Sequence, residues 1–217
     1  MPASIRRRRE ELKQMAIARL FILVTAFTLA AHGASSATGS ASEFVAQLGD
    51  QAINVLRTTD TDLGDREARF RGLLRQGFDL GFIGRFALGP HWRRATAEQR
   101  SDYLEVFGDY VLQTYSSRLG GYAGETMTIV AERRAGEKDS LVQTEIARPS
   151  GPAISAEWRV RNIDGRQRII DITIEGVSMA VTKRSEFSAV IQSRGVDGLI
   201  AALRAHTNKV SATASRN

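Results

Sequence analysis

The chain has 217 residues, a formal net charge of +6 and no cysteine. Without cysteine it has no disulfide, no thiol nucleophile, no cysteine-based metal site and no lipid-modified cysteine. Residues 1–37 hold six of the 30 Lys and Arg residues and two of the 24 Asp and Glu residues, which leaves 24 basic against 22 acidic residues in the rest. Nucleic-acid-binding proteins usually have a larger basic excess, clustered on one face. We therefore expect no nucleic-acid partner.

The first residues have the order of a secretory signal peptide. Basic residues, including the run 6–9, precede an uncharged stretch over 20–31, and small residues follow it. A basic, an apolar and a small-residue region in this order are typical of export signals. The apolar stretch is shorter than the roughly 20 residues that a membrane-spanning helix needs, and an uncleaved anchor is the alternative. We expect a signal peptide over 1–37, cleavage after Ala37 or Ala41, and a periplasmic mature protein.

Helical spacing of apolar residues dominates the first half of the remaining chain and returns at its end. We expect helices over 43–57, 62–76 and 79–88, and a long one from a capping box at Thr96 to about Leu119. Near the end, two short helices are expected over 184–194 and 196–206, with Gly195 between them, and 207–217 is expected to fray.

Between these helical regions the period changes to two, which indicates strands. Four strands are expected over 126–134, 140–148, 153–162 and 167–175. Short turns separate them and favour an antiparallel meander. Two apolar faces follow from the alternation, namely Ile154, Ala156, Trp158 and Val160, and then Ile170, Ile172 and Ile174. The helices must cover such a face, so we predict an α+β fold. In it, N-terminal helices pack on a four-stranded antiparallel curved sheet, with short C-terminal helices, in one domain over 43–206.

The search for catalytic and metal-binding residues is mostly negative. No phosphate-binding loop, dinucleotide-binding glycine motif or zinc-protease motif occurs. Of the three histidines, His32 lies in the predicted signal peptide and His206 near the tail, so only His91 is a candidate general base. The segment 176–180 lacks the second glycine of a nucleophile elbow. Three alternatives stay open: a binding protein with an apolar cavity, a small enzyme that uses His91 or Asp171, and an adaptor with a solid core.

Several short motifs, taken in order, resemble the MlaC family of periplasmic phospholipid-binding proteins, also called toluene-tolerance auxiliary transport components. The resemblance runs from about Phe78 to Leu203. Its pieces are 82–92, 96–100, Tyr103, Phe107, Tyr115, 171–178, Arg184, Phe187, Gly195, Leu199, Ile200 and Leu203. Each piece is weak alone, and their order and spacing together are specific.

The resemblance implies a nuclear-transport-factor-2-like (NTF2-like) cup with an apolar cavity, no cofactor, no metal and no catalysis. It implies a carrier that shuttles phospholipid between two membrane complexes. One is an inner-membrane ABC transporter with a periplasmic lipid-channel subunit, and the other is an outer-membrane lipoprotein/porin complex. A close branch of the family is associated with hopanoid biosynthesis, so a hopanoid is the alternative ligand.

A lipid carrier needs only apolar walls, because each buried methylene contributes about 0.8 kcal/mol to binding. The predicted wall residues are Phe82, Phe86, Trp92, Phe107, Val111, Tyr115, Ile129, Ile154, Trp158, Ile170, Ile172 and Val177. Plain core packing is the alternative for each of them. A phosphate is costly to bury without partners, so Arg85, Arg93 and Arg94 are predicted near the headgroup.

Overall fold

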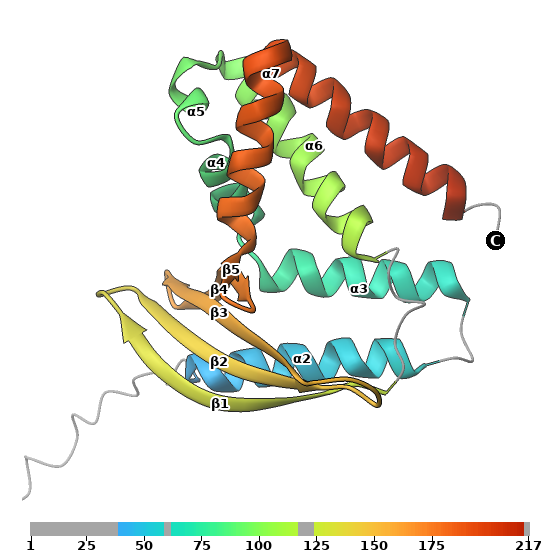
Figure 1. Cartoon of the computed structure of the whole chain (residues 1–217), viewed down its shortest axis with the longest axis vertical. Helices are drawn as coiled ribbons and strands as arrows, with labels where there is room; N and C mark the ends of the chain where they lie inside the picture. The colour runs from blue at the N-terminus through green and yellow to red at the C-terminus, as the bar shows by residue number, and fades with distance from the viewer. Residues whose placement is uncertain (1–38, 59–61, 117–123, 215–217) are drawn as a thin grey trace, which may run out of the picture. The chain divides into compact units, whose positions relative to one another are not determined.

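The computed structural model describes residues 39–58, 62–116 and 124–214, the last four without their side chains (Figure 1). The predicted signal peptide over 1–37 lies outside the described residues. Among the described helices, none is both long enough and apolar enough to cross a membrane. The described part is a mixture of helices and one antiparallel sheet, as the sequence predicts.

The N-terminal helices begin at side-chain caps that the local sequence supplies. Ser40 Oγ accepts from the backbone N of Glu43 at 3.1 Å, and the Glu43 carboxylate accepts from the backbone N of Ser40 at 2.8 Å. The same reciprocal pair forms between Thr96 and Gln99. The helices are α2 (Ala41–Arg57), α3 (Leu63–Gly77), α4 (Leu80–Leu88), α5 (His91–Arg94) and α6 (Ala97–Ser116). Sequence analysis located all of them except α5, the single turn that follows Gly89 and Pro90.

The sheet is an antiparallel meander with the order β1-β2-β3-β4-β5. Its strands are β1 (Thr126–Ala135), β2 (Asp139–Ala147), β3 (Ile154–Ile163), β4 (Arg166–Ile174) and β5 (Val177–Ser178). The predicted number of four strands is therefore wrong by one. The fifth strand has two residues and returns along β4 through a tight turn at Glu175 and Gly176, both with positive φ. Two residues are too few to show a period in the sequence.

A bulge interrupts the expected alternation in β4. Arg159 of β3 pairs with Asp171, whereas its neighbour Val160 pairs with Ile169, so Ile170 is the extra residue. The expected regular face from Ile170 to Ile174 is therefore broken, and Ile169 joins the side chains that pack on α2. Ile170 is buried as well.

The C-terminal helix α7 (Met179–Ala214) bends at Gly195, where φ is 70° and ψ is −180°. This conformation is open essentially only to glycine, which confirms the predicted break between two helices. The helical backbone begins five residues earlier than predicted and continues to Ala214. The described residues 207–214, where sequence analysis expected a frayed tail, thus have helical backbone.

The apolar side chains form two separate clusters. The helical cluster joins α4, α6 and α7 around Tyr103, Phe107 and Phe187, with Phe187 edge-on to both other rings. The sheet cluster joins α2 to the sheet through residues such as Val45 and Val142. Helix α3 contacts α2 on one side and α6 on the other (Figure 1). The two clusters therefore face each other across α3 and β4.

Candidate functional site

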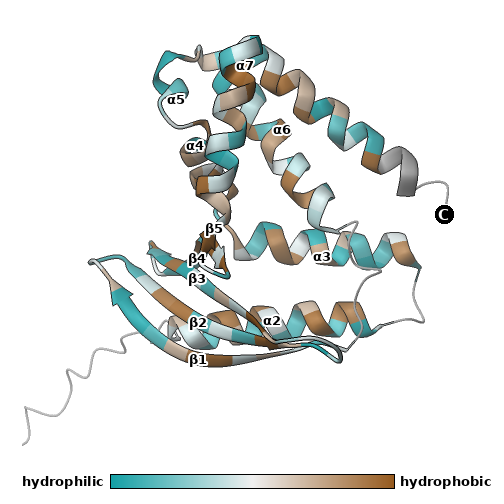
Figure 2. Cartoon of the chain, in the orientation of Figure 1, coloured by the Kyte–Doolittle hydropathy of each residue, from teal (hydrophilic) through white to brown (hydrophobic). Residues whose placement is uncertain are grey.

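A narrow apolar cavity lies between the helical cluster and the sheet cluster. Its volume is about 140 Å³. It is lined by Leu74, Phe78, Leu80, Ile83, Phe107, Tyr110, Val111, Tyr115, Asp171, Ile172, Ile174, Met179, Ala180 and Lys183. These residues come from the C-terminal end of α3, from α4 and α6, from the second half of β4 and from the first turns of α7. In Figure 2, α4 is predominantly coloured as hydrophobic.

Four of the predicted wall residues line this cavity. Phe107, Val111 and Tyr115 project from successive turns of α6, and Ile172 lies opposite them on β4. The residues that sequence analysis missed on the walls are Leu74, Phe78, Leu80, Ile83, Tyr110, Ile174, Met179, Ala180 and Lys183. Leu74 lies in the last turn of α3 and Phe78 is its C-cap residue, whose backbone N–H donates to the Leu74 carbonyl.

The other predicted wall residues lie outside the cavity lining. Phe82, Phe86 and Trp92 each lie beneath a guanidinium group, of Arg161, Arg184 and Arg85 respectively. Ile129 is exposed on the edge strand β1, Ile154 is half-buried on β3, and Ile170 is buried at the bulge.

Trp158 packs in the sheet cluster as the cross-strand partner of Ile172, and its indole N–H donates to Thr144 Oγ1 at 2.9 Å. Trp158 therefore lies beside Ile172 on the same face of the sheet, next to the cavity wall. Val177 is more than half exposed and lies at the rim described next.

Exposed apolar side chains surround one end of the cavity. Tyr115 and Ile174 line it and are each more than a third exposed, and Val177 is the cross-strand partner of Ile174. Val181, on the first turn of α7, is 52% exposed. Clustered exposed apolar residues are typical of a surface that contacts another apolar molecule. These residues therefore form an apolar rim at the β4–β5 corner of the cavity.

Two polar residues on the cavity wall are engaged with neighbours. The carboxylate of Asp171 accepts from Ser178 Oγ at 2.6 Å and from the backbone N of Ala180 at 3.0 Å, and so caps α7. Lys183 donates to Glu186 at 2.7 Å and lies over the ring of Tyr110. Burial lowers the pKa of Lys183, but hydrogen bonds with Glu186 and Tyr110 outweigh it, and the pKa is raised. Lys183 and Asp171 are therefore the charged residues on a mostly apolar wall.

The candidate general bases lie in different places. His91 is on α5, where its Nε2 is 3.5 Å from Ser188 Oγ, and it does not line the cavity. Asp171 lines the cavity but both of its oxygens are occupied by the α7 cap. Among the described residues, no group of three or more His, Asp or Glu side chains is placed to hold a metal ion.

A second, polar groove adjoins the cavity at the other end of β4. Its volume is about 560 Å³, and it is lined by Arg75, Phe78, Asp79, Leu80, Ile163, Asp164, Arg166 and Arg168. Phe78 and Leu80 belong to both linings. The segment between α3 and α4 is held against β4 here, because the backbone N of Asp79 donates to the Ile169 carbonyl at 2.9 Å. We call this space the arginine groove.

The predicted headgroup residues do not line either space. Arg85 stacks on Trp92, and Arg93 and Arg94 are exposed on α5. The cations beside the cavity are instead those of the arginine groove, together with Lys183. Sequence analysis missed them because Arg75 is some ninety residues from Arg166 and Arg168, and only the fold brings the three together.

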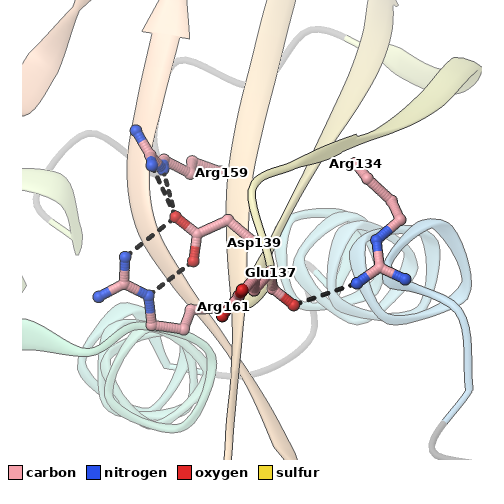
Figure 3. A network of polar contacts seen from close by, with 5 residues as sticks. All are labelled: Arg134, Glu137, Asp139, Arg159 and Arg161. Atoms are coloured by element: carbon pink, nitrogen blue, oxygen red, sulfur yellow. Dashed lines mark hydrogen bonds and ion pairs between the residues drawn. The ribbon is translucent and has the colours of Figure 1, made fainter.

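A network of charged residues lies at the neighbouring end of the sheet (Figure 3). Asp139 is nearly fully buried and accepts from Arg161 Nε at 2.6 Å and from Arg159 Nε at 2.7 Å. The hydrogen bond with Arg161 lowers the pKa of Asp139, and the one with Arg159 adds to this, against the opposing effect of burial. The Arg161 guanidinium also lies 4.6 Å from the centre of the Phe82 ring. This network therefore links β2 and β3 to α4.

Comparisons with known proteins agree on one family. The family model described as "MlaC protein" matches residues 46–205. An intermembrane phospholipid transport system binding protein MlaC from Haemophilus influenzae is 26% identical over 126 residues, which cover 56% of this chain and 59% of that protein. A toluene tolerance protein, ttg2D, from Pseudomonas putida is 23% identical over 105 residues, or 48% of this chain and 49% of that protein. The alignments thus span about half to three-fifths of these relatives.

Among solved structures, the chain is similar to a phospholipid-binding protein from Ralstonia solanacearum that was determined in complex with a phospholipid. The TM-score is 0.69 at 22% sequence identity, and the match covers 80% of this chain and 99% of that one. At this level of identity the similarity establishes that the two chains share a fold.

Proposed function

Since this chain belongs to the MlaC family, we propose that it is a periplasmic lipid carrier that holds the acyl chains of a phospholipid in the cavity between its two clusters. The observation that supports this most strongly is the cavity itself, an apolar space that lies between two hydrophobic clusters and has an apolar rim. The names of the relatives and the phospholipid complex of the structural neighbour point to the same ligand class.

The cavity must widen to accept a lipid. Its volume of about 140 Å³ is below the roughly 300–1,000 Å³ of pockets that enclose a small organic ligand. Because the wall is shared between two separately packed clusters, it can widen if the clusters move apart without either core being broken. Each methylene that enters contributes about 0.8 kcal/mol, so even part of one tail offsets a substantial opening cost.

We further propose that the carrier works without chemistry on its ligand. The support is that Asp171 is held by the α7 cap and that His91 lies away from the cavity. In this account the chain receives lipid from one membrane complex and delivers it to another. The partners we propose are an inner-membrane ABC transporter with a periplasmic lipid-channel subunit and an outer-membrane lipoprotein/porin complex. The basic and apolar N-terminal residues, as an export signal, support a periplasmic location.

Native mass spectrometry of the protein released from the periplasm without detergent tests this function. We expect one glycerophospholipid per protein, identified after solvent extraction. A hopanoid would reassign the ligand while retaining the carrier. A protein that is empty and takes up no lipid from added vesicles would contradict the proposal and would favour the adaptor or the enzyme.

A further inference from the structure

The arginine groove contains an unusual concentration of unneutralised positive charge. Among the described residues, the guanidinium groups of Arg75, Arg166 and Arg168 make no hydrogen bond, ion pair or ring contact. Asp139, Arg159 and Arg161 at the same end of the sheet are, by contrast, engaged with one another. Arg161 in particular is bound to Asp139 through two hydrogen bonds. Three free guanidinium groups in one groove are a ready site for an anion with several oxygens.

The strand register places two positive charges opposite each other, which destabilises the sheet when no anion is bound. Arg161 of β3 lies directly opposite Arg168 of β4. Like charges in directly opposed positions of an antiparallel pair destabilise it. Asp139 offsets the charge of Arg161, but its two oxygens are already occupied by Arg161 and Arg159. Arg168 therefore lacks a counter-charge on the sheet.

Two carboxylates also line the groove, and they do not cancel its charge. Asp79 caps α4 by accepting from the backbone N of Phe82 at 2.8 Å, and it interacts electrostatically with Arg161. Asp164 lies in the β3–β4 turn, with a φ of 49°. Three arginines against these two carboxylates leave the lining of the groove with a net charge of +1.

The groove and the cavity are in line along β4. Arg166 and Arg168 begin the strand, and Ile172 and Ile174 end it inside the cavity. Because Ile170 is a bulge, Arg168 and Ile172 lie opposite Arg161 and Trp158, which are three residues apart on β3, or about 10 Å. Phe78 and Leu80 line both spaces, so the groove and the cavity adjoin at these residues.

We propose that the arginine groove binds the phosphate of an anionic glycerophospholipid headgroup, so that the protein selects anionic over zwitterionic lipids. The proposal rests on the proposed function, because the tails of the same lipid then occupy the cavity. A zwitterionic headgroup brings its own cation close to the three arginines, whereas the headgroup of phosphatidylglycerol brings only the phosphate charge. Electrostatic repulsion therefore disfavours the zwitterionic lipid.

Competition between two lipids tests the selection. Delipidated full-length mature protein is incubated with vesicles of equal parts phosphatidylglycerol and phosphatidylcholine at 50 mM salt, reisolated, and its two lipids are quantified by mass spectrometry. The variants are Arg75→Gln/Arg166→Gln/Arg168→Gln and, as a control with the same change in charge, Arg69→Gln/Arg93→Gln/Arg94→Gln. The control residues are exposed and lie outside both spaces. Thermal unfolding verifies that both variants are folded.

We expect the wild-type protein and the control to be enriched in phosphatidylglycerol at least five-fold, and the groove variant to lose this enrichment. An enrichment that survives in the groove variant, or that the control loses equally, would overturn the proposal. The total lipid bound reports on the proposed function separately, because an unselective carrier still loads lipid. In a parallel titration, inorganic phosphate that binds the groove tightly while leaving the lipid ratio unchanged would show a free-phosphate site and would also overturn the headgroup assignment.

Discussion

Asp171 and Ser178 form the junction between the sheet and the C-terminal helix. The Ser178 hydroxyl donates to the Asp171 carboxylate at 2.6 Å and accepts from the backbone N of Val181 at 3.1 Å. Asp171 also accepts from the backbone N of Ala180. The free N–H groups at the start of α7 are thus capped by two side chains, one of them from β4. This junction fixes α7 against the wall of the cavity.

We expect Asp171→Ala to lower the free energy of unfolding by about 1–2 kcal/mol, the usual loss for a helix cap. Ser178→Ala should cost a similar amount. Because the two side chains form one unit, the double variant should cost less than the sum of the single ones by at least about 0.5 kcal/mol. Urea unfolding of the four proteins gives this double-mutant cycle, and strictly additive losses would contradict the shared cap.

Filling the cavity should abolish lipid uptake while leaving the fold intact. Val111 is half-buried on α6 and lines the cavity. We expect Val111→Phe to reduce lipid uptake from vesicles at least ten-fold, because the new ring occupies part of about 140 Å³. Overpacking should cost about 1–3 kcal/mol of stability. Val196→Phe is the matched control, since Val196 packs on the helical cluster outside the cavity; equal losses in both variants would contradict the assignment.

The Asp139 network should make the free energy of unfolding depend on pH in the acidic range. Hydrogen bonding with Arg161 lowers the pKa of Asp139. The contribution of Asp139 to the free energy of unfolding is therefore fully present above the ordinary aspartate pKa of about 3.9. It is lost as the pH falls through the lower pKa of the folded state. We expect Asp139→Asn to cost about 1–3 kcal/mol at pH 7, less than for a fully buried pair because the arginines are partly exposed.

The test of this dependence is urea unfolding between pH 2.5 and pH 7. The difference between wild type and Asp139→Asn should shrink below about pH 4. Glu105→Gln, at an exposed position of α6, removes the same charge without touching the network. A difference between wild type and Asp139→Asn that stays constant down to pH 2.5 would rule out the proposed linkage.

Two glycines should respond to alanine in opposite directions. Gly195 has a φ of 70° and a ψ of −180°, so Gly195→Ala should cost about 1–3 kcal/mol. Gly108 lies within α6, and no atom lies within 4 Å of a Cβ added there. Gly108→Ala should therefore raise the free energy of unfolding by about 0.5–1 kcal/mol. Thermal unfolding measures both changes. A Gly195→Ala variant as stable as the wild-type protein would mean that the bend at residue 195 needs no glycine.

The elements that the sequence predicts well are those set by local chemistry. The capping box predicted at Thr96 and the helical spacing after it fix where α6 begins. The capping box at Ser40 was not predicted, and α2 begins two residues before the expected residue 43. The two-residue strand β5 and the bulge at Ile170 depend on the register between strands. The period of apolar residues within one strand carries no information about that register. The bulge is the reason that an unbroken alternation from Ile170 to Ile174 was a wrong expectation.

The candidate site was predicted only in part, for a related reason. The sequence indicates which residues are apolar, and Phe107, Val111, Tyr115 and Ile172 do line the cavity. Whether an apolar residue faces a cavity or a filled core depends on how distant elements pack. Phe82 is equally apolar and instead lies under Arg161. The arginine groove likewise arises only because α3 ends beside the first residues of β4.

Nuclear Overhauser effects between a lipid and isoleucine methyl groups test the central claim most directly. The protein, labelled at isoleucine methyls, is loaded with phospholipid, and contacts to acyl methylene protons are recorded with tail-deuterated lipid as the blank. Ile83, Ile172 and Ile174 line the cavity, whereas Ile146 and Ile200 lie elsewhere. Our account predicts cross-peaks from the acyl chain to the first three methyl groups and none to the other two. Cross-peaks confined to Ile146, Ile200 or other residues outside the lining, or none from a loaded protein, would contradict it.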